Sequence, residues 1–156
     1  MSSAFSFVVN GVARRIAAEG DTPLLYVLRN DLGLKSARFG CGTEQCGSCM
    51  VLLDGRAVYA CTTLLSSVGG RNVTTVEGLG SESNPHRLQR ALLDEQAAQC
   101  GYCLSGILIR AAALLAENPR PDEGAVRAAL DANLCRCGAH NRIVRAVLRA
   151  ASDTAA

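Results

Sequence analysis

The sequence predicts an α+β protein with two small domains, a strand-rich first half and a helical second half. Three observations support this prediction. Short apolar runs separated by turn residues fill the chain up to about residue 76, whereas apolar residues recur at helical spacing after about residue 86. Between these patterns, residues 78–85 concentrate Gly, Ser, Asn and Pro, which is typical of a linker. We therefore expect one domain over residues 1–79 and a second over residues 80–156.

The expected strands of the first half are residues 4–9, 12–17, 50–53, 57–60 and 72–76. Asn10-Gly11 and Asp54-Gly55 are expected as tight hairpin turns, because these residue types tolerate the positive φ that such turns need. One helix is expected over about residues 24–32, with Asp21-Thr22 as its N-cap. A few strands around one helix, with a long glycine-rich loop at 39–48, are typical of a β-grasp fold.

The expected helices of the second half are residues 87–98, 105–117, 123–132 and 141–151. Each carries apolar residues at i, i+3 and i+4, which is the spacing of one helix face. The second half is therefore predicted to be a four-helix domain. Each half alone is small for a stable core, so metal ligation is expected to supply part of the folding free energy.

Composition argues against several classes of function. The net charge is +2, and neither half has the basic excess that nucleic-acid binding needs. The first ten residues do not look like a signal peptide, and no window reaches the roughly 18–20 apolar residues of a membrane span. We therefore expect a cytoplasmic chain with no direct membrane span and no nucleic-acid partner. Export or membrane association of a whole complex would depend on a partner subunit.

The eight cysteines form two unlike groups of four. The first group reads C-x4-C-x2-C and then a fourth cysteine after eleven residues: Cys41, Cys46, Cys49 and Cys61. The second group combines C-x2-C with C-x-C: Cys100, Cys103, Cys135 and Cys137. Thiols stay reduced in the cytosol, so disulfides are the weaker interpretation. Two complete sets of four thiolates predict two inorganic sites.

The spacing of the first group favours iron–sulfur chemistry, because plant-type ferredoxins hold a [2Fe–2S] cluster with this spacing. Gly40, Gly42 and Gly47 permit tight turns in which backbone N–H groups point at the sulfurs. Structural zinc is the weaker alternative. Zinc sites prefer closely paired cysteines, and neither Cys41 nor Cys61 belongs to a close pair.

The spacing of the second group leaves its chemistry open. Both cysteine pairs directly precede a predicted helix, where free backbone N–H groups and the helix dipole favour an anionic cluster. The pattern is compatible with zinc as well as with iron–sulfur. Cys100-Gly-Tyr-Cys103 also has the spacing of a thioredoxin-like redox pair, although no βαβ pattern surrounds it.

Taken together, the motifs carry a family resemblance. The chain contains Phe39-Gly-Cys41-Gly, Gln45-Cys46-Gly-Ser-Cys49, Gln99-Cys100-Gly-Tyr-Cys103 and Asn133-Leu-Cys135-Arg-Cys137-Gly138. These motifs resemble those of the small iron–sulfur subunit of the molybdenum hydroxylases, the xanthine oxidase-like family. The resemblance runs from about Phe5 to Leu148 and accounts for every cysteine. It implies a plant-type ferredoxin-like β-grasp domain followed by a four-helix [2Fe–2S]-binding domain.

The resemblance also implies a function and partners. A large subunit would bind molybdenum with a pterin cofactor and hydroxylate the substrate, while this chain carries electrons one at a time through two [2Fe–2S] clusters. The second cysteine group would hold the cluster proximal to molybdenum, and the first group would hold the distal one. In the family, the residues at the positions of Gln99 and Cys137 contact the pterin. The electron acceptor would be an FAD subunit or a c-type cytochrome.

Two stretches depart from the commonest family pattern. Leu104-Ser105-Gly106 stands where many members have Thr-Pro-Gly, and Gly138-Ala139-His140 stands where many have Thr-Gly-Tyr. These variants are similar to the branch that oxidises N-heterocycles or aldehydes, some members of which pass electrons to a c-type cytochrome. They do not alter the cysteines.

A free-standing two-cluster ferredoxin is the alternative function. Diffusible plant-type ferredoxins are usually acidic, however, whereas this chain is slightly basic. No catalytic acid, base or nucleophile is predicted on the chain itself. His86 is expected to start a helix at the surface, and His140 is expected to be a cap or interface residue, because the thiolate sets are already complete.

Overall fold

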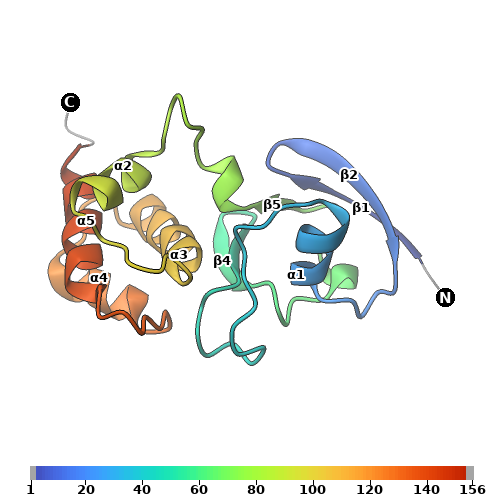
Figure 1. The fold of residues 1–156 in the computed structure, drawn as a ribbon. Coiled ribbons are helices and arrows are strands. Elements are labelled where there is room, and N and C mark those ends of the chain that lie inside the picture. Colours follow the sequence, from blue (N-terminus) through green and yellow to red (C-terminus); the bar gives the residue numbers. More distant parts are fainter. Residues whose placement is uncertain (1–2, 154–156) are drawn as a thin grey trace.

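In the computed structural model, which describes residues 3–153, a five-stranded sheet is followed by four helices (Figure 1). The strands are β1 (Ser3–Val9), β2 (Val12–Ala18), β3 (Met50–Leu53), β4 (Arg56–Tyr59) and β5 (Asn72–Thr74). Their order in the sheet is β2-β1-β5-β3-β4; β1 and β5 are parallel, and the other neighbours are antiparallel. This sheet and the helix beside it form the predicted β-grasp, called the sheet domain below.

Both predicted hairpin turns are confirmed. Val9 pairs with Val12 across Asn10-Gly11, and Leu53 pairs with Arg56 across Asp54-Gly55. All four turn residues have positive φ, between 49° and 82°. Positive φ at both central positions matches the right-handed twist of the flanking strands, which is why these dipeptides determine the register of the two hairpins.

The helix between β2 and β3 differs from the expectation at its start. Helix α1 covers Leu24–Tyr26 and continues as a π-helical segment, η1, over Val27–Asp31. Its N-cap residue is Pro23, and no side chain caps it, so the predicted Asp21-Thr22 cap is wrong. The expected helical span is otherwise confirmed.

Tertiary hydrogen bonds replace the expected cap of α1. The N–H group of Leu24 donates to the carbonyl oxygen of Thr63 (2.8 Å), and the N–H group of Leu25 donates to that of Ala60 (2.9 Å). The first N–H groups of a helix have no partner within the helix, and a side-chain cap normally satisfies one of them. Here a segment distant in the sequence satisfies them instead.

The helical domain contains α2 (Arg87–Asp94), α3 (Leu104–Glu117), α4 (Glu123–Leu130) and α5 (His140–Ser152), which confirms the predicted four helices. Helix α2 ends four residues earlier than expected. Gln96 has φ 48°, and this left-handed conformation cannot continue an α-helix. The described residues contain no helix that is long and apolar enough to cross a membrane.

Each domain has its own apolar core. In the sheet domain, α1 and η1 bury four side chains completely against the sheet: Leu24, Leu25, Val27 and Leu28. In the helical domain, α2, α3 and α5 bury Leu88, Ile107 and Ile143 completely. Two separate cores mean that one domain can lose part of its stability while the other stays folded.

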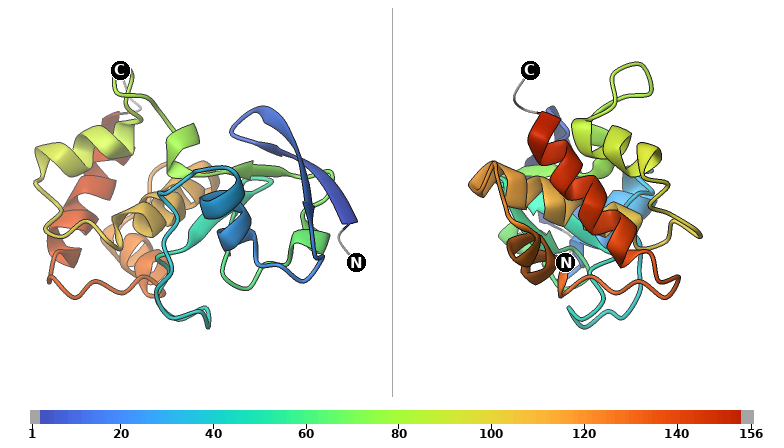
Figure 2. Two further views of the ribbon diagram at one scale, coloured as in Figure 1. Left: turned by 45° about the vertical axis from the view of Figure 1, so that its right-hand side comes forward. Right: turned by 90° about the vertical axis from the view of Figure 1, so that its left-hand side faces the viewer.

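Helix α3 joins the two domains, because it packs against β3 and β4 on one side and against α2 and α4 on the other (Figures 1 and 2). A short 3-10 turn, η2 (Leu65–Ser67), lies between β4 and β5, and a second, η3 (Val76–Gly78), follows β5 on the way to α2. Val76 and Leu79 already pack against the helical core. The boundary between residues 79 and 80 stays a prediction, and Met1, Ser2 and residues 154–156 lie outside the described residues.

The start of α2 carries a titratable cap. His86 is the N-cap residue; its Nδ1 accepts from the N–H group of Leu88 (3.2 Å), and its own N–H group donates to Gln89 Oε1 (2.8 Å). This reciprocal arrangement is a capping box. Burial, followed by the charges of Arg87 and Arg90, lowers the pKa of His86 below its usual value. The structure therefore confirms that His86 starts a helix, and it places the ring half-buried.

We expect the chain to lose stability as the pH falls below about 6.5, the usual pKa of histidine. Because the folded-state pKa is lowered, the unfolded chain binds the proton first. The contribution of the cap is therefore complete above the unfolded-state pKa and is lost as the pH falls through the folded-state pKa. His86→Asn keeps a capping oxygen that does not titrate.

The variant should therefore lose less stability than the wild type between about pH 7.5 and 5.5, by roughly 1 kcal/mol. Urea unfolding followed by circular dichroism at each pH measures this difference. The same pH dependence in both proteins would contradict the prediction.

Candidate cluster-binding sites

The first cysteine group lies on the loop between η1 and β3, and Cys61 joins it from the segment after β4. Backbone N–H groups of the loop point at the sulfurs. Thr43 and Gln45 donate to Cys41 Sγ at 3.4 and 3.2 Å, and Cys41 donates to Cys46 Sγ at 3.3 Å. Such donors stabilise negative charge on thiolates and on the cluster that thiolates hold.

The backbone covers one sulfur of this loop very closely. A Cβ atom added at Gly40 would lie 2.5 Å from Cys46 Sγ, which is closer than any real contact allows. Only glycine lets the chain approach the sulfur in this way. The loop therefore forms a tight cradle around the thiols, as a buried inorganic group requires.

The protein environment makes two thiols of this group differ. Burial alone would raise the pKa of the Cys41 thiol, but the N–H groups of Thr43 and Gln45 lower it to about 6. Burial raises the pKa of Cys49 to about 12, and the nearby thiol of Cys61 adds to this rise. Cys41 is therefore prepared as a thiolate, whereas Cys49 needs a bound metal to ionise near neutral pH.

The second cysteine group lies where two helices begin. Cys103 is the N-cap residue of α3, and Cys135 and Cys137 precede α5, as predicted. The sulfur atoms of Cys100 and Cys137 are 3.4 Å apart. The N–H group of Tyr102 donates to Cys100 Sγ at 3.5 Å.

The thiols of this group also differ in ionisation. Burial raises the pKa of Cys103 to about 12, and the neighbouring thiol of Cys135 adds to this rise. Burial alone would also raise the pKa of Cys135, but backbone N–H groups, led by that of Ala139, lower it. Each site thus combines a thiol whose pKa is lowered with one whose pKa burial raises to about 12.

The strongest interactions among the thiols join them two by two: Cys41 with Cys46, Cys49 with Cys61, Cys100 with Cys137 and Cys103 with Cys135. Weaker effects on the pKa also link different pairs of the same group, such as Cys46 with Cys49 and Cys100 with Cys103. Two pairs per site fit a [2Fe–2S] cluster, in which each iron takes two cysteine ligands.

The structure brings the two predicted pterin-contacting residues together. Gln99 is exposed, and its Nε2 donates to the carbonyl oxygen of Cys137 (3.2 Å). Cys100, which follows Gln99, is also exposed. The second thiol group therefore reaches the surface beside Gln99. The contact of Gln99 and Cys137 with a pterin stays a prediction.

The loops that carry the two groups are joined directly. The N–H group of Leu134, one residue before Cys135, donates to the carbonyl oxygen of Cys46 (3.0 Å). Asn133, which is 2% exposed, donates from Nδ2 to the carbonyl oxygen of Gly47 (3.4 Å). A single backbone hydrogen bond thus connects a ligand of the first site with the residue next to a ligand of the second.

Sequence reasoning missed Arg38 as a member of this arrangement. Its Nη1 donates to the carbonyl oxygens of Gly101 (2.5 Å) and Tyr102 (3.1 Å), between the first two cysteines of the second group. No local pattern in the sequence points to a contact between residues so far apart. His140 is the first residue of α5, but the N-cap residue of this helix is Ala139 and no side chain caps it, so the predicted cap role of His140 is wrong. The Nε2 atom of His140 contacts the carbonyl oxygen of Asn133 (2.9 Å).

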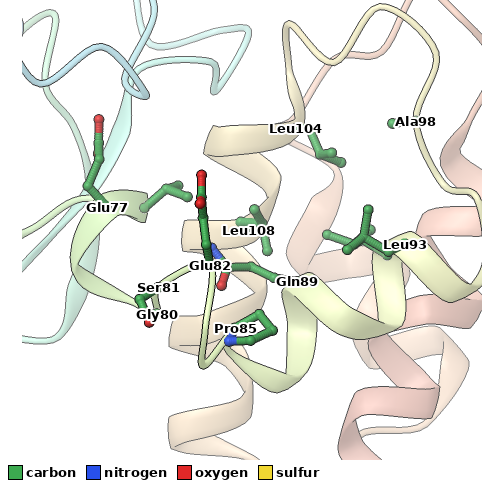
Figure 3. A pocket seen from close by; sticks show the side chains of 12 residues that line it. Glu77, Gly80, Ser81, Glu82, Pro85, Gln89, Leu93, Ala98, Leu104 and Leu108 are labelled. Carbon is green, nitrogen blue, oxygen red and sulfur yellow. The ribbon is translucent and has the colours of Figure 1, made fainter.

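A separate apolar pocket of about 550 Å³ lies between η3, the linker, α2 and α3 (Figure 3). Leu93 from α2 and Leu104 and Leu108 from α3 line it, while Glu77 and Glu82 stand at its edge toward the linker (Figure 3). None of the eight cysteines lines this pocket. The redox chemistry of the chain is therefore located at the cysteine loops and not in this pocket.

Two family models match the chain. One, described as a 2Fe-2S iron-sulfur cluster binding domain, matches residues 7–71, and the other, described as a [2Fe-2S] binding domain, matches residues 75–148. Each match contains one complete cysteine group. The two domains therefore bind two [2Fe–2S] clusters.

Similar proteins agree with these matches. The chain is 51% identical to one of the subunits of nicotinate dehydrogenase from Pseudomonas putida, over 97% of this chain and 96% of that protein. It is 46% identical to the alpha subunit of isoquinoline 1-oxidoreductase from Brevundimonas diminuta, over 96% and 98% of the two chains. In the structure of quinoline 2-oxidoreductase from Pseudomonas putida 86, a chain that is 35% identical matches with a TM-score of 0.92, over 97% and 94% of the two chains.

A second solved structure shows the same unit inside a larger chain. Aldehyde oxidoreductase from Desulfovibrio gigas matches 97% of this chain with a TM-score of 0.94 and 37% identity, but the match covers only 17% of that protein. A chain of this fold therefore occurs both as a short separate chain and as part of a longer polypeptide. This chain belongs to the iron–sulfur small subunits of the molybdenum hydroxylases and is an electron-transfer subunit with two [2Fe–2S] clusters.

Proposed function

We propose that this chain takes electrons from the molybdenum–pterin centre of a large subunit, then passes them to an acceptor, in a complex that oxidises an N-heteroaromatic compound. The observation that carries this proposal is the arrangement of the thiol groups. One group reaches the surface beside Gln99, and its loop is hydrogen-bonded to the loop of the other group through Leu134 and Cys46. The names of the nicotinate, isoquinoline and quinoline relatives support the substrate class.

When bound, two [2Fe–2S] clusters supply two one-electron steps, which divide the electron pair released by a hydroxylation. The residues of this chain place and tune them. Cys100, Cys103, Cys135 and Cys137 would hold the cluster proximal to molybdenum. Cys41, Cys46, Cys49 and Cys61 would hold the distal cluster.

The chain's own groups prepare these sites. Backbone N–H groups lower the pKa of Cys41 and Cys135, although burial opposes this change, so that one thiolate of each site is available to a metal. The backbone at Gly40 lies close against Cys46 Sγ, where a side chain would not fit. We propose that an FAD subunit or a c-type cytochrome accepts the electrons beside the first group, and that the complex is cytoplasmic unless a partner subunit carries an export signal.

Purification of the native complex tests this proposal. Native mass spectrometry with metal, flavin and haem analysis should find a large molybdenum-containing subunit, together with two [2Fe–2S] clusters on this chain. Flavin or haem in the complex then identifies the acceptor. A chain that purifies alone with two clusters would support the free-standing ferredoxin instead, and a colourless chain with bound zinc would overturn both functions.

We expect Gln99→Ala to slow electron transfer from molybdenum to the proximal cluster, held by the second cysteine group, by about 10- to 100-fold, the usual cost of removing an outer-sphere contact. Both clusters should still assemble, because the Gln99 side chain is not a ligand and its hydrogen bond goes to a carbonyl oxygen. Stopped-flow reduction of the clusters by substrate measures the rate.

Gln45→Ala is the matched control for this variant. Gln45 is also exposed and also directly precedes a ligand cysteine, but it lies on the loop of the other group. Its replacement should leave the rate of substrate-driven reduction unchanged. Equal rates in the wild type and both variants would disprove the assignment of Gln99.

A further inference from the structure

We propose that Arg38, a residue of the sheet domain, raises the reduction potential of the cluster held by the helical domain. This inference rests on the proposed function, because it requires the second cysteine group to hold a redox-active cluster. Arg38 stands only three residues before Cys41 in the sequence, yet its guanidinium group contacts the loop of the other group. It therefore acts across the domain interface.

The contact continues through one peptide unit to a ligand sulfur. Arg38 Nη1 donates to the carbonyl oxygen of Gly101 (2.5 Å). The N–H group of the same peptide unit, that of Tyr102, donates to Cys100 Sγ (3.5 Å). Two consecutive hydrogen bonds thus link the Arg38 guanidinium group, through the peptide unit between Gly101 and Tyr102, to Cys100 Sγ.

Hydrogen bonds in such a chain strengthen one another. A cation on the carbonyl oxygen withdraws electron density from the peptide unit, so its N–H group becomes a better donor to the thiolate. A stronger donor favours the more negatively charged, reduced form of a cluster and so raises its potential. The full positive charge of Arg38 favours the reduced form in addition.

The guanidinium group is held in one position. The backbone N–H group of Arg38 donates to the carbonyl oxygen of Ser48 (3.1 Å), and its Cζ lies 5.4 Å from the centre of the Tyr102 ring. The hydroxyl of Tyr102 in turn donates to the carbonyl oxygen of Phe39. Because Arg38 is also half-buried, its charge is less screened by solvent than that of an exposed arginine.

In the first group, the sulfur atoms of Cys41 and Cys46 receive hydrogen bonds from their own loop. Cys41, Thr43 and Gln45 supply the N–H groups there, and Arg38 donates to none of those sulfurs. We therefore expect Arg38 to affect the cluster of the sheet domain less than the cluster of the helical domain, although it lies nearer to the former in sequence.

The test is a redox titration of the cluster-loaded chain followed by EPR, with Arg38→Gln as the variant. A Cys103→Ser chain first identifies which EPR signal belongs to the helical domain. At a fixed ambient potential, the ratio of reduced to oxidised helical-domain cluster should fall about threefold or more in Arg38→Gln. The signal of the sheet-domain cluster should shift less.

Three further variants separate tuning from structural damage. Tyr102→Phe removes the hydrogen bond to Phe39 but keeps the ring and the peptide unit, so it should lower stability and shift the potential much less than Arg38→Gln does. Arg15→Gln removes the same charge from an exposed position on β2 and should move neither potential. Arg38→Lys keeps the charge and should retain part of the effect.

The outcomes also separate this inference from the proposed function. If both signals titrate but Arg38→Gln leaves the helical-domain potential unchanged, the role of Arg38 is wrong and the two-cluster function stands. If Tyr102→Phe shifts that potential as much as Arg38→Gln, loop distortion explains the change and the inference is also wrong. If the wild type shows no second [2Fe–2S] signal, the proposed function itself fails.

Discussion

Replacement of Cys103 with serine is expected to abolish the cluster of the helical domain and to leave the cluster of the sheet domain in place. Cys103 caps α3 and is packed against the helical core, where burial raises the pKa of its thiol to about 12. A serine hydroxyl is a far weaker acid than a thiol, and burial at this position disfavours its ionised form further. It therefore cannot replace the thiolate as an iron ligand.

The iron content should fall by about half, and one of two EPR signals should disappear, because a [2Fe–2S] site needs four ligands. Cys49→Ser is the matched control, since Cys49 is the thiol of the other group whose pKa burial raises to about 12. It should remove the other signal. The separate apolar cores of the two domains explain why each loss is expected to stay local. Loss of both clusters in either variant would show that the sites assemble as one unit.

Gly106→Ala is expected to destabilise the chain by about 3 kcal/mol, the upper range for overpacking a close contact. A Cβ atom at position 106 would lie 1.8 Å from the carbonyl oxygen of Gly47 and 3.1 Å from Ser48 Cα. Both neighbours are backbone atoms, so no side-chain rotation relieves the overlap. Helix α3 must move away from the loop that carries Cys46 and Cys49.

Gly124→Ala is the matched control for the domain contact. Gly124 also lies within a helix, α4, but the nearest atom to an added Cβ is Asp122 Oδ1 at an ordinary 3.4 Å. Alanine forms helices better than glycine, so this variant should be more stable than the wild type by up to about 1 kcal/mol. Urea unfolding of the cluster-loaded proteins measures both changes.

The splitting of the EPR lines, which reports magnetic coupling between the two reduced clusters, gives a second measurement on the same variants. Gly106→Ala should weaken the magnetic coupling between the two reduced clusters, because the domains separate. Gly124→Ala should leave the coupling as in the wild type. Equal stability in the two variants would mean that the close packing of α3 on Gly47 does not hold the domains together.

Local sequence patterns predicted most of the fold. Asn10-Gly11 and Asp54-Gly55 determine their hairpins, because the conformations those residues tolerate are those the turns need. The four helices follow from apolar spacing within about ten residues, and their ends differ from the prediction where a single residue such as Gln96 adopts positive φ. The Asp21-Thr22 cap failed because distant carbonyl groups satisfy the start of α1.

The cysteine pattern by itself determined that this chain has two sites with four thiols each, because the number and spacing of ligands are properties of the sequence. The tertiary structure decided how those sites meet. Leu134 bonds to Cys46, Arg38 reaches the loop of Cys100, and Gly106 packs on Gly47, and each contact joins residues more than fifty positions apart. No local pattern encodes such contacts, because they form only when two separately folded domains present their backbones to each other.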